Sequence, residues 1–253
     1  MKKLTLFSLF GIMLVVLSGC QAVENQEGFF YNTFVKPMDW LLNNIGDWLG
    51  GSYGLAIIAI TVAIRLILMP FMLKNYRQQS QMKAKMDIIK PKMDEIQAKL
   101  KQATTKEEQM ALQQQMVGLY REHNINPLNM GCLPIIIQMP IIMGLYFAIL
   151  YSNEIKGSEF LWFSLGSPDI ILTAIAGVIY FVQAKVSLWT VPEAQKQQMK
   201  MMIYISPIMI VIISISSMAA LPLYWSISGL LLIFQTYLGR KYYTDQTQVT
   251  EAK

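Results

Sequence analysis

The chain has 253 residues, of which 54% are hydrophobic and 15% are charged. Soluble domains carry about 25% charged residues, and the apolar residues of this chain form long runs, which excludes an ordinary soluble globular protein. The formal net charge is +5, a basic excess that in such a chain indicates membrane topology rather than nucleic-acid binding. Two cysteines and one histidine leave little material for a metal centre or a disulfide framework, so we expect no metal and no cofactor.

Residues 1–19 have the features of a secretory signal: two lysines, a short apolar run and Leu-Ser-Gly before Cys20. The Leu-Ser-Gly-Cys sequence resembles the lipobox of bacterial lipoproteins. The resemblance implies that the chain is cut before Cys20, which then carries an S-diacylglycerol and an N-acyl group outside the cell. An ordinary signal peptide with an unrelated cysteine is the alternative.

We expect residues 20–54 to form an extracytoplasmic segment that contains an amphipathic helix. Apolar side chains recur at steps of three and four between Phe34 and Leu49, and Trp40 and Trp48 accompany them. Tryptophan is favoured at membrane surfaces, so we expect the helix to lie at the outer interface. The same apolar stripe could instead pack on the protein itself.

Five apolar runs of helical length follow, and they predict an all-α polytopic membrane protein with a five-helix transmembrane bundle. The expected spans are residues 55–73, 127–151, 170–187, 203–218 and 223–238. Because the connection at 219–222 is so short, the last two spans must be antiparallel neighbours.

The distribution of basic residues orients this bundle. With the N-terminus outside, the loops at 152–169 and 219–222 are also outside, and the segments at 74–126, 188–202 and 239–253 are cytosolic. Sixteen of the 21 Lys and Arg residues lie in or next to these three inner segments, against two in the outer ones. This asymmetry follows the positive-inside rule.

Residues 74–126 predict a cytosolic helical hairpin. Its apolar residues, many of them methionines, follow a helical period on both arms, and Thr105 with Glu108 forms a capping box at the start of the second arm. Pro91 suits the first turn of a new helix better than a helix interior, so we expect a kink there. The methionines either fill the seam between the arms, which we favour, or offer an adaptable surface to apolar peptides.

No catalytic pattern is present: the sequence lacks a glycine-rich phosphate loop, a His-Glu-x-x-His sequence and a Gly-x-Ser-x-Gly sequence. His123, at the membrane-proximal end of the hairpin, is better explained as an interfacial residue than as a catalytic base. We therefore expect that the protein is not an enzyme.

Arg65 is the exceptional residue. It lies nine residues before Lys74, which at 1.5 Å per residue places it about 13–14 Å deep in a core of about 30 Å. A charge at that depth costs about 2.5–3.5 kcal/mol on insertion scales. The arginine could snorkel along a tilted helix, but a wet cavity or a buried partner explains its depth better.

No expected span carries an acid in its interior, so the polar groups available to Arg65 are neutral. Each of them alone could be a routine interhelical hydrogen bond. Together with Arg65 they predict a hydrophilic groove with an uncompensated positive charge. The neutral residues are Thr61, Gln138, Gln183, Ser214 and Gln235.

The stretch from Asn126 to Pro140, Asn-Pro-Leu-Asn-Met-Gly-Cys-Leu-Pro-Ile-Ile-Ile-Gln-Met-Pro, is distinctive. It resembles the hallmark of the YidC-type membrane protein insertase family, which includes the mitochondrial inner-membrane and chloroplast thylakoid insertases. Ile64-Arg65, the charged hairpin with Pro91, and Leu223-Tyr224-Trp225 match as well. The lipobox and the lack of a large outer domain are similar to the short Gram-positive branch.

The resemblance implies a protein that inserts, folds and assembles membrane proteins, alone or with the Sec translocon, and that is not an enzyme. Its groove would open to the cytosol and to lipid. Arg65 matches the family's groove arginine, Gln183 its polar neighbour in the third span, and Trp225 its aromatic residue in the fifth.

The implied partners are nascent membrane-protein clients, the Sec translocon, the lipid bilayer and, transiently, the ribosome, since the tail after Arg240 is short and only weakly basic. The expected location is the bacterial plasma membrane, with the C-terminus in the cytosol. A small-solute transporter is the alternative, but we find no inverted repeat and no acid for cation coupling.

The lipobox resemblance can be tested by intact-mass measurement of the purified protein. The expected mass corresponds to loss of residues 1–19 and addition of lipid at Cys20. Cys20→Ala should block the modification, while the five apolar spans still hold the protein in the membrane. An uncut, unmodified N-terminus would contradict the prediction.

Overall fold

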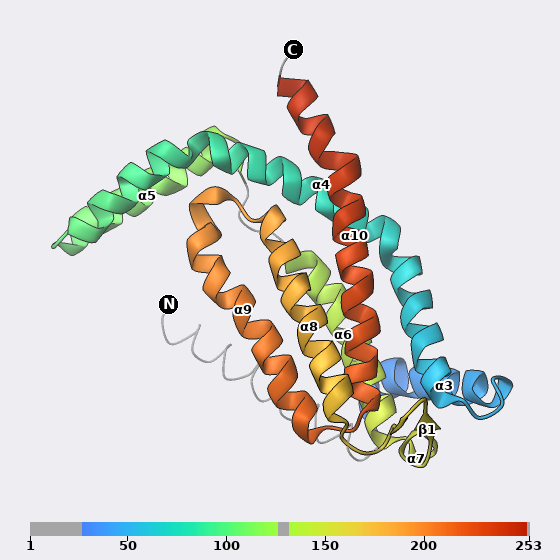
Figure 1. Cartoon of the computed structure of the whole chain (residues 1–253). Helices are drawn as coiled ribbons and strands as arrows, with labels where there is room; N and C mark the ends of the chain where they lie inside the picture. The colour runs from blue at the N-terminus through green and yellow to red at the C-terminus, as the bar shows by residue number, and fades with distance from the viewer. Residues whose placement is uncertain (1–26, 126–131, 252–253) are drawn as a thin grey trace.

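The computed structural model describes residues 27–125 and 132–251, which are almost entirely helical (Figure 1). This confirms the all-α class. In the described part, a short antiparallel β-hairpin, in which β1 (Glu159–Phe160) pairs with β2 (Phe163–Ser164), interrupts the helices. The elements are α2 (Gly28–Phe30), the π-helix η1 (Tyr31–Val35), α3 (Lys36–Trp48), α4 (Tyr53–Gln102), α5 (Lys106–Glu122), α6 (Cys132–Tyr151), α7 (Asn153–Lys156), β1 (Glu159–Phe160), β2 (Phe163–Ser164), α8 (Ile170–Ser187), the 3-10 helix η3 (Leu188–Thr190), α9 (Glu193–Ser216) and α10 (Ala220–Glu251).

Four helical segments in the described part of the chain are long and apolar enough to cross a membrane. They lie in Tyr53–Gln102, Ile170–Thr190, Met199–Ser216 and Ala220–Tyr243. Gln138–Tyr151, the part of α6 whose side chains are described, is also apolar. α10 packs against α4 and α8, and α8 packs against α9, so the long helices form one bundle (Figure 1). The chain is therefore a polytopic membrane protein.

The first membrane segment and the first arm of the hairpin are one helix, which overturns the expected place of Pro91. α4 continues from the bundle into the hairpin as one helix, with Pro70 and Pro91 in its interior. An interior proline removes one backbone hydrogen bond and bends a helix without necessarily ending it, and α4 is visibly bent along its length in Figure 1. Pro91 is thus not the first turn of a new helix.

Two other segments that we expected to be a loop and a tail are helical. α9 begins at Glu193, inside the expected loop at 188–202. α10 continues to Glu251, through most of the expected tail at 239–253. In both cases the helix continues into polar sequence. The apolar pattern indicates which residues are in an apolar environment, but it does not indicate where the backbone hydrogen bonds of the helix end.

The hairpin consists of the distal part of α4 and the antiparallel α5 (Figure 1). Its second arm starts where we expected, because the Glu108 backbone N–H donates to Thr105 Oγ1 at 3.3 Å. Met86 and Met93 are fully buried in a cluster with Ile89 and Leu119. These two methionines therefore fill the seam between the arms, the interpretation that we favoured.

The amphipathic helix α3 lies across one end of the bundle, beside the start of α4 (Figure 1). Its apolar stripe packs on the protein, since Leu42 is buried and Leu41 and Ile45 lie against the same cluster. Trp40 and Trp48 on the same helix remain exposed. The apolar stripe of α3 is thus part of the protein core, and the two tryptophan side chains lie on the surface.

The main hydrophobic core lies at this same end. It joins the first turns of α4 and α10 to the last turns of α6, with α3 and the β-hairpin packed over them. Two backbone bonds fasten the connection before α10, from the Ala219 N–H to the Ser167 carbonyl at 2.9 Å and from the Ala220 N–H to the Leu165 carbonyl at 3.0 Å. This end of the bundle is consequently closed by packed side chains.

Two glycines offer a matched test of that packing. A Cβ at Gly54, in the second position of α4, would overlap the ring of Phe160, whereas a Cβ at Gly118 of α5 would meet nothing within 4 Å. We expect Gly54→Ala to destabilise the protein by about 1–3 kcal/mol through overpacking. Gly118→Ala should be neutral or stabilise by up to about 1 kcal/mol, because alanine favours a helix.

The measurement is thermal unfolding of the two variants, purified in the same detergent and compared with the parent protein. Equal midpoints for both variants would show that the β-hairpin does not pack on α4 as described.

Candidate functional site

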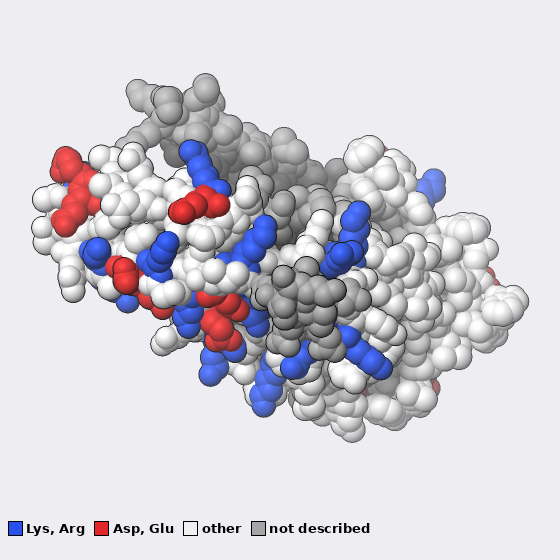
Figure 2. Space-filling model, turned by 90° about the horizontal axis from the view of Figure 1, so that it is seen from above, with Lys and Arg blue, Asp and Glu red and all other residues white. Residues whose placement is uncertain are grey.

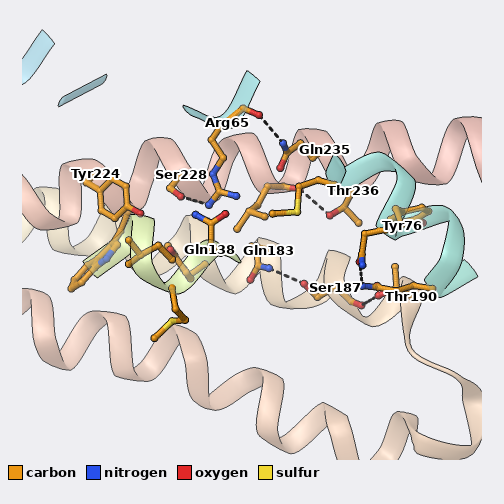
Figure 3. Close-up of a pocket in the computed structure, with 18 residues that line it drawn as sticks. Arg65, Tyr76, Gln138, Gln183, Ser187, Thr190, Tyr224, Ser228, Gln235 and Thr236 are labelled. Carbon is orange, nitrogen blue, oxygen red and sulfur yellow. Dashed lines mark hydrogen bonds between the residues drawn. The ribbon is translucent and has the colours of Figure 1, made fainter. Parts of the chain in front are cut away.

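A cavity of about 400 Å³ lies between α4, α6, α8 and α10, next to the packed end of the bundle (Figure 3). Eighteen residues line it. Twelve carry a neutral amide or hydroxyl group, five are apolar, and Arg65 alone is charged. The walls are therefore polar although the helices that form them are apolar overall.

Arg65 is 5% exposed. Its guanidinium donates a hydrogen bond to the hydroxyl of Ser228 on α10, and Figure 3 shows Gln138 beside it. The Arg65 backbone carbonyl accepts a hydrogen bond from Gln235 Nε2 at 3.3 Å. No Asp or Glu is among the described residues that line the cavity, so hydroxyl and amide groups surround the charge without neutralising it.

Two buried oxygens in the cavity lack the hydrogen-bond donors that water could supply. Gln138 Oε1 and Gln235 Oε1 have no hydrogen-bond partner among the described residues, and buried polar atoms are normally satisfied by protein or by water. A volume of about 400 Å³ holds on the order of ten water molecules at about 30 Å³ each. A wet cavity also lowers the cost of keeping Arg65 charged.

The structure brings four of the six residues that we expected near Arg65 into one cavity with it. Gln138 comes from α6, Gln183 from α8, and Trp225 and Gln235 from α10. Gln183 Nε2 donates to Ser187 Oγ at 2.8 Å along the same wall. Amide side chains from three helices thus line a single space.

Thr61 and Ser214 lie outside this cavity. Thr61 is 2% exposed, and its hydroxyl donates to the Ile57 carbonyl of its own helix at 2.7 Å. Ser214 is 0% exposed, and its hydroxyl has no hydrogen-bond partner among the described residues. Cys20 falls outside the residues that the structure describes.

Comparison with known proteins agrees with this architecture. Residues 44–246 match the family model of the 60Kd inner membrane protein. The membrane protein insertase YidC of Staphylococcus carnosus (strain TM300) is 49% identical over 98% of this chain and 88% of its own length. The protein of the same name from Staphylococcus aureus (strain MRSA252) is 50% identical over 96% of this chain and 87% of its own. The chain belongs to the YidC membrane protein insertase family. It is a membrane protein insertase.

The sequence analysis of this insertase missed Ser228, which accepts the Arg65 hydrogen bond, and named Tyr224 only as part of a motif and not as a lining residue. Both are buried, and both line the cavity with Gln235. A periodic signal was available, because Tyr224, Ser228 and Gln235 are separated by four and seven residues and so share one face of a helix. Noticing that spacing would have identified Ser228 as a partner for Arg65.

A second missed group lines the cavity toward the hairpin. Asn75 and Gln79, both on α4, line it, and Gln79 Nε2 donates to Asn75 Oδ1 at 2.6 Å. Tyr76 lines it between them. These residues show that the polar wall continues past Arg65 to the end at which α4 leaves the bundle.

Cysteine accessibility tests whether the cavity is wet and from which side it opens. In a Cys132→Ser background, Gln183→Cys should react with a membrane-impermeant thiol reagent in inside-out vesicles but not in intact cells. Ser214→Cys, on the neighbouring helix but outside the cavity, should react more slowly by more than about tenfold, since a thiol reacts only where it is solvated. Equal reaction of both positions would contradict the described cavity.

Proposed function

We propose that this insertase accepts the polar tail of an incoming membrane protein in the Arg65 cavity and passes the following apolar segment into lipid. The observation that carries the proposal is the buried guanidinium, which has Ser228 as its hydrogen-bond partner and no acid beside it in the described cavity wall. A client carboxylate would find a positive charge and no competing anion.

The electrostatics favour capture of an acidic tail. The attraction between two unit charges grows as the dielectric constant falls, so a carboxylate is held more strongly near Arg65 than it would be in bulk water. The tail would then leave the cytosol in two steps, from cytosol to wet cavity and from cavity to the outer side. Each step has a smaller desolvation cost than one transfer across the hydrocarbon core.

The side of the cavity offers a route to lipid. Among the described residues, α6 packs chiefly on η1 and α3 rather than on α8, and we propose that the client leaves the cavity on the side between α6 and α8. Exposed apolar side chains, among them Val178 and Phe181, cover the outside of α8. Transfer of an apolar client segment to lipid stabilises it by roughly 25 cal/mol per Å² removed from water, which supplies the net driving force.

The orientation that we propose places the hairpin in the cytosol and the packed end outside. Figure 2, which looks onto the hairpin end, shows lysines and arginines over the hairpin, where Asp and Glu lie between them, and over the adjoining end of the bundle. These basic residues support the proposed orientation, because basic residues are favoured on the cytosolic side of a membrane. We propose a plasma-membrane location, a lipid anchor on Cys20, and contacts of the hairpin end with the Sec translocon and, transiently, with the ribosome. Within the same proposal the protein also assists folding and assembly of its clients.

The test is insertion of two client proteins that differ only in the acidic residues of their N-terminal tails. We expect Arg65→Ala to reduce insertion of the acidic client on the order of tenfold, which corresponds to about 1.4 kcal/mol, and to affect the neutral client little. Arg65→Lys should retain most activity because the charge matters more here than the planar guanidinium. Arg65→Glu should be the most damaging.

Membrane levels of each variant serve as the control for folding. Equal impairment of both clients by Arg65→Ala, at normal protein levels, would show that Arg65 hydrates or supports the bundle and does not capture acidic tails.

A further inference from the structure

The turn between α8 and α9 is held by side chains from two other helices. We call residues 188–193, which comprise η3 and the start of α9, the inner turn. Lys83 Nζ of α4 donates to the Trp189 carbonyl at 3.0 Å, and the Glu193 backbone N–H donates to Asp87 Oδ1 of α4 at 2.9 Å. From the other side, the Arg240 guanidinium of α10 lies over the Trp189 ring at 4.5 Å. Residues of α4 and α10 that are distant in sequence thus contact the six residues of the inner turn.

Asp87 supplies a cap that α9 lacks. The N-cap residue of α9 is Pro192, and its side chain makes no capping bond. The first amides of a helix have no partner within the helix, and an oxygen that accepts from them stabilises the helix start. A carboxylate is especially favourable there because the helix N-terminus carries a partial positive charge. Asp87 meets both requirements from another helix.

Lys83 faces the opposite kind of helix end. The Trp189 carbonyl belongs to η3, which directly follows α8, and carbonyls at a helix C-terminus carry a partial negative charge. Lys83 and Asp87 are four residues apart and therefore share one face of α4. One turn of α4 thus presents a cation to the end of α8 and an anion to the start of α9.

The lysines around Glu193 are consistent with this placement of α4 beside the start of α9. The pKa of Glu193 is lowered, first by the hydrogen bond that Lys196 donates to it, and the charges of Lys196, Lys83 and Lys90 add to the effect against a contribution from burial. Lysines of α4 therefore act on the start of α9 as well as on the end of α8.

The inner turn forms part of the cavity rim. Thr190 in the turn and Ser187 directly before it line the cavity, and Figure 3 shows both at the end of the row of lining residues away from Arg65. Asn75 and Gln79 of α4 line it too, a few residues before Lys83. The contacts of Lys83 and Asp87 consequently join this rim to the base of the hairpin.

We infer that Lys83 and Asp87 are positioning residues that dock the base of the hairpin on the inner turn through complementary helix-end charges, and so set the orientation of the hairpin at the mouth of the cavity. The inference rests on the insertase function but does not depend on capture of acidic tails. It assigns the two side chains roles toward α8 and α9 rather than toward each other.

Exchanging the charges of Lys83 and Asp87 distinguishes contacts with two helix ends from an ordinary ion pair between the two side chains. In the double variant Lys83→Asp/Asp87→Lys, a pair of mutually attracting charges would be preserved. Against fixed helix ends, the same exchange places an anion beside a carbonyl and a cation beside an amide. The double variant should therefore be more disturbed than either single neutralisation, Lys83→Met or Asp87→Ala.

The measurement is the distance between spin labels at position 104, at the tip of the hairpin, and position 237 on α10, in the full-length protein in lipid bilayers with Cys132→Ser. The parent should give one narrow distribution. Asp87→Ala should raise the undocked population roughly fivefold, and Asp87→Asn should restore most of the docking because an amide oxygen also caps a helix. Lys92→Met and Asp94→Ala, which neutralise exposed charges farther along α4, are the matched controls.

Client insertion provides the second measurement. Variants that undock the hairpin should slow the acidic and the neutral client of the matched pair alike, whereas tail capture by Arg65 predicts a difference between the two clients. If Asp87→Ala does not accumulate in the membrane, Arg240→Gln tests the same turn from the α10 side and should also broaden the distribution. Unchanged distances in these variants, or restoration by the charge exchange, would overturn the inference.

Discussion

The arrangement of the bundle follows from the need to keep one guanidinium charged inside apolar helices. Arg65 is almost fully buried, and a charge at that depth is costly unless polar groups or water surround it. Here Ser228 accepts its hydrogen bond and amide side chains line the space around it. Because these groups are neutral, they do not cancel the positive charge of the guanidinium. The helices cannot close over this region without stripping the charge of its surroundings, so a cavity persists.

Packed regions lie on both sides of this cavity. The main core joins α3, the β-hairpin and the first turns of α4 and α10, and it closes one end of the cavity. At the other end, the inner turn is fastened to α4 and α10 through Lys83, Asp87 and Arg240. Between these two regions the cavity separates parts of α4, α6, α8 and α10, while α10 still packs against α4 and α8. This combination suits the function that we propose, in which the site admits a polar chain without loss of the fold.

Much of the site could be predicted because depth along a span is a property of the sequence. Arg65 and the glutamines at 138, 183 and 235 lie at depths that the 1.5 Å rise of a helix fixes, and all four line the cavity. Thr61 and Ser214 lie outside it because depth does not say which way a side chain faces. Thr61, one turn from Arg65, falls within the closely packed region and bonds its own helix.

The sequence by itself determined the helical class, the apolar spans, the depth of Arg65 and the absence of an acid to neutralise it, because these depend on composition and on the period of one helix. Tertiary structure alone decided that α4 continues through Pro91, that α3 uses its apolar stripe for the core, and that Asp87 caps a helix 106 residues away. Each of these depends on what packs beside a segment. A neighbour can offset the penalty of a proline, bury a stripe that would otherwise meet lipid, or supply an oxygen to a distant amide, and no local pattern records which neighbour that will be.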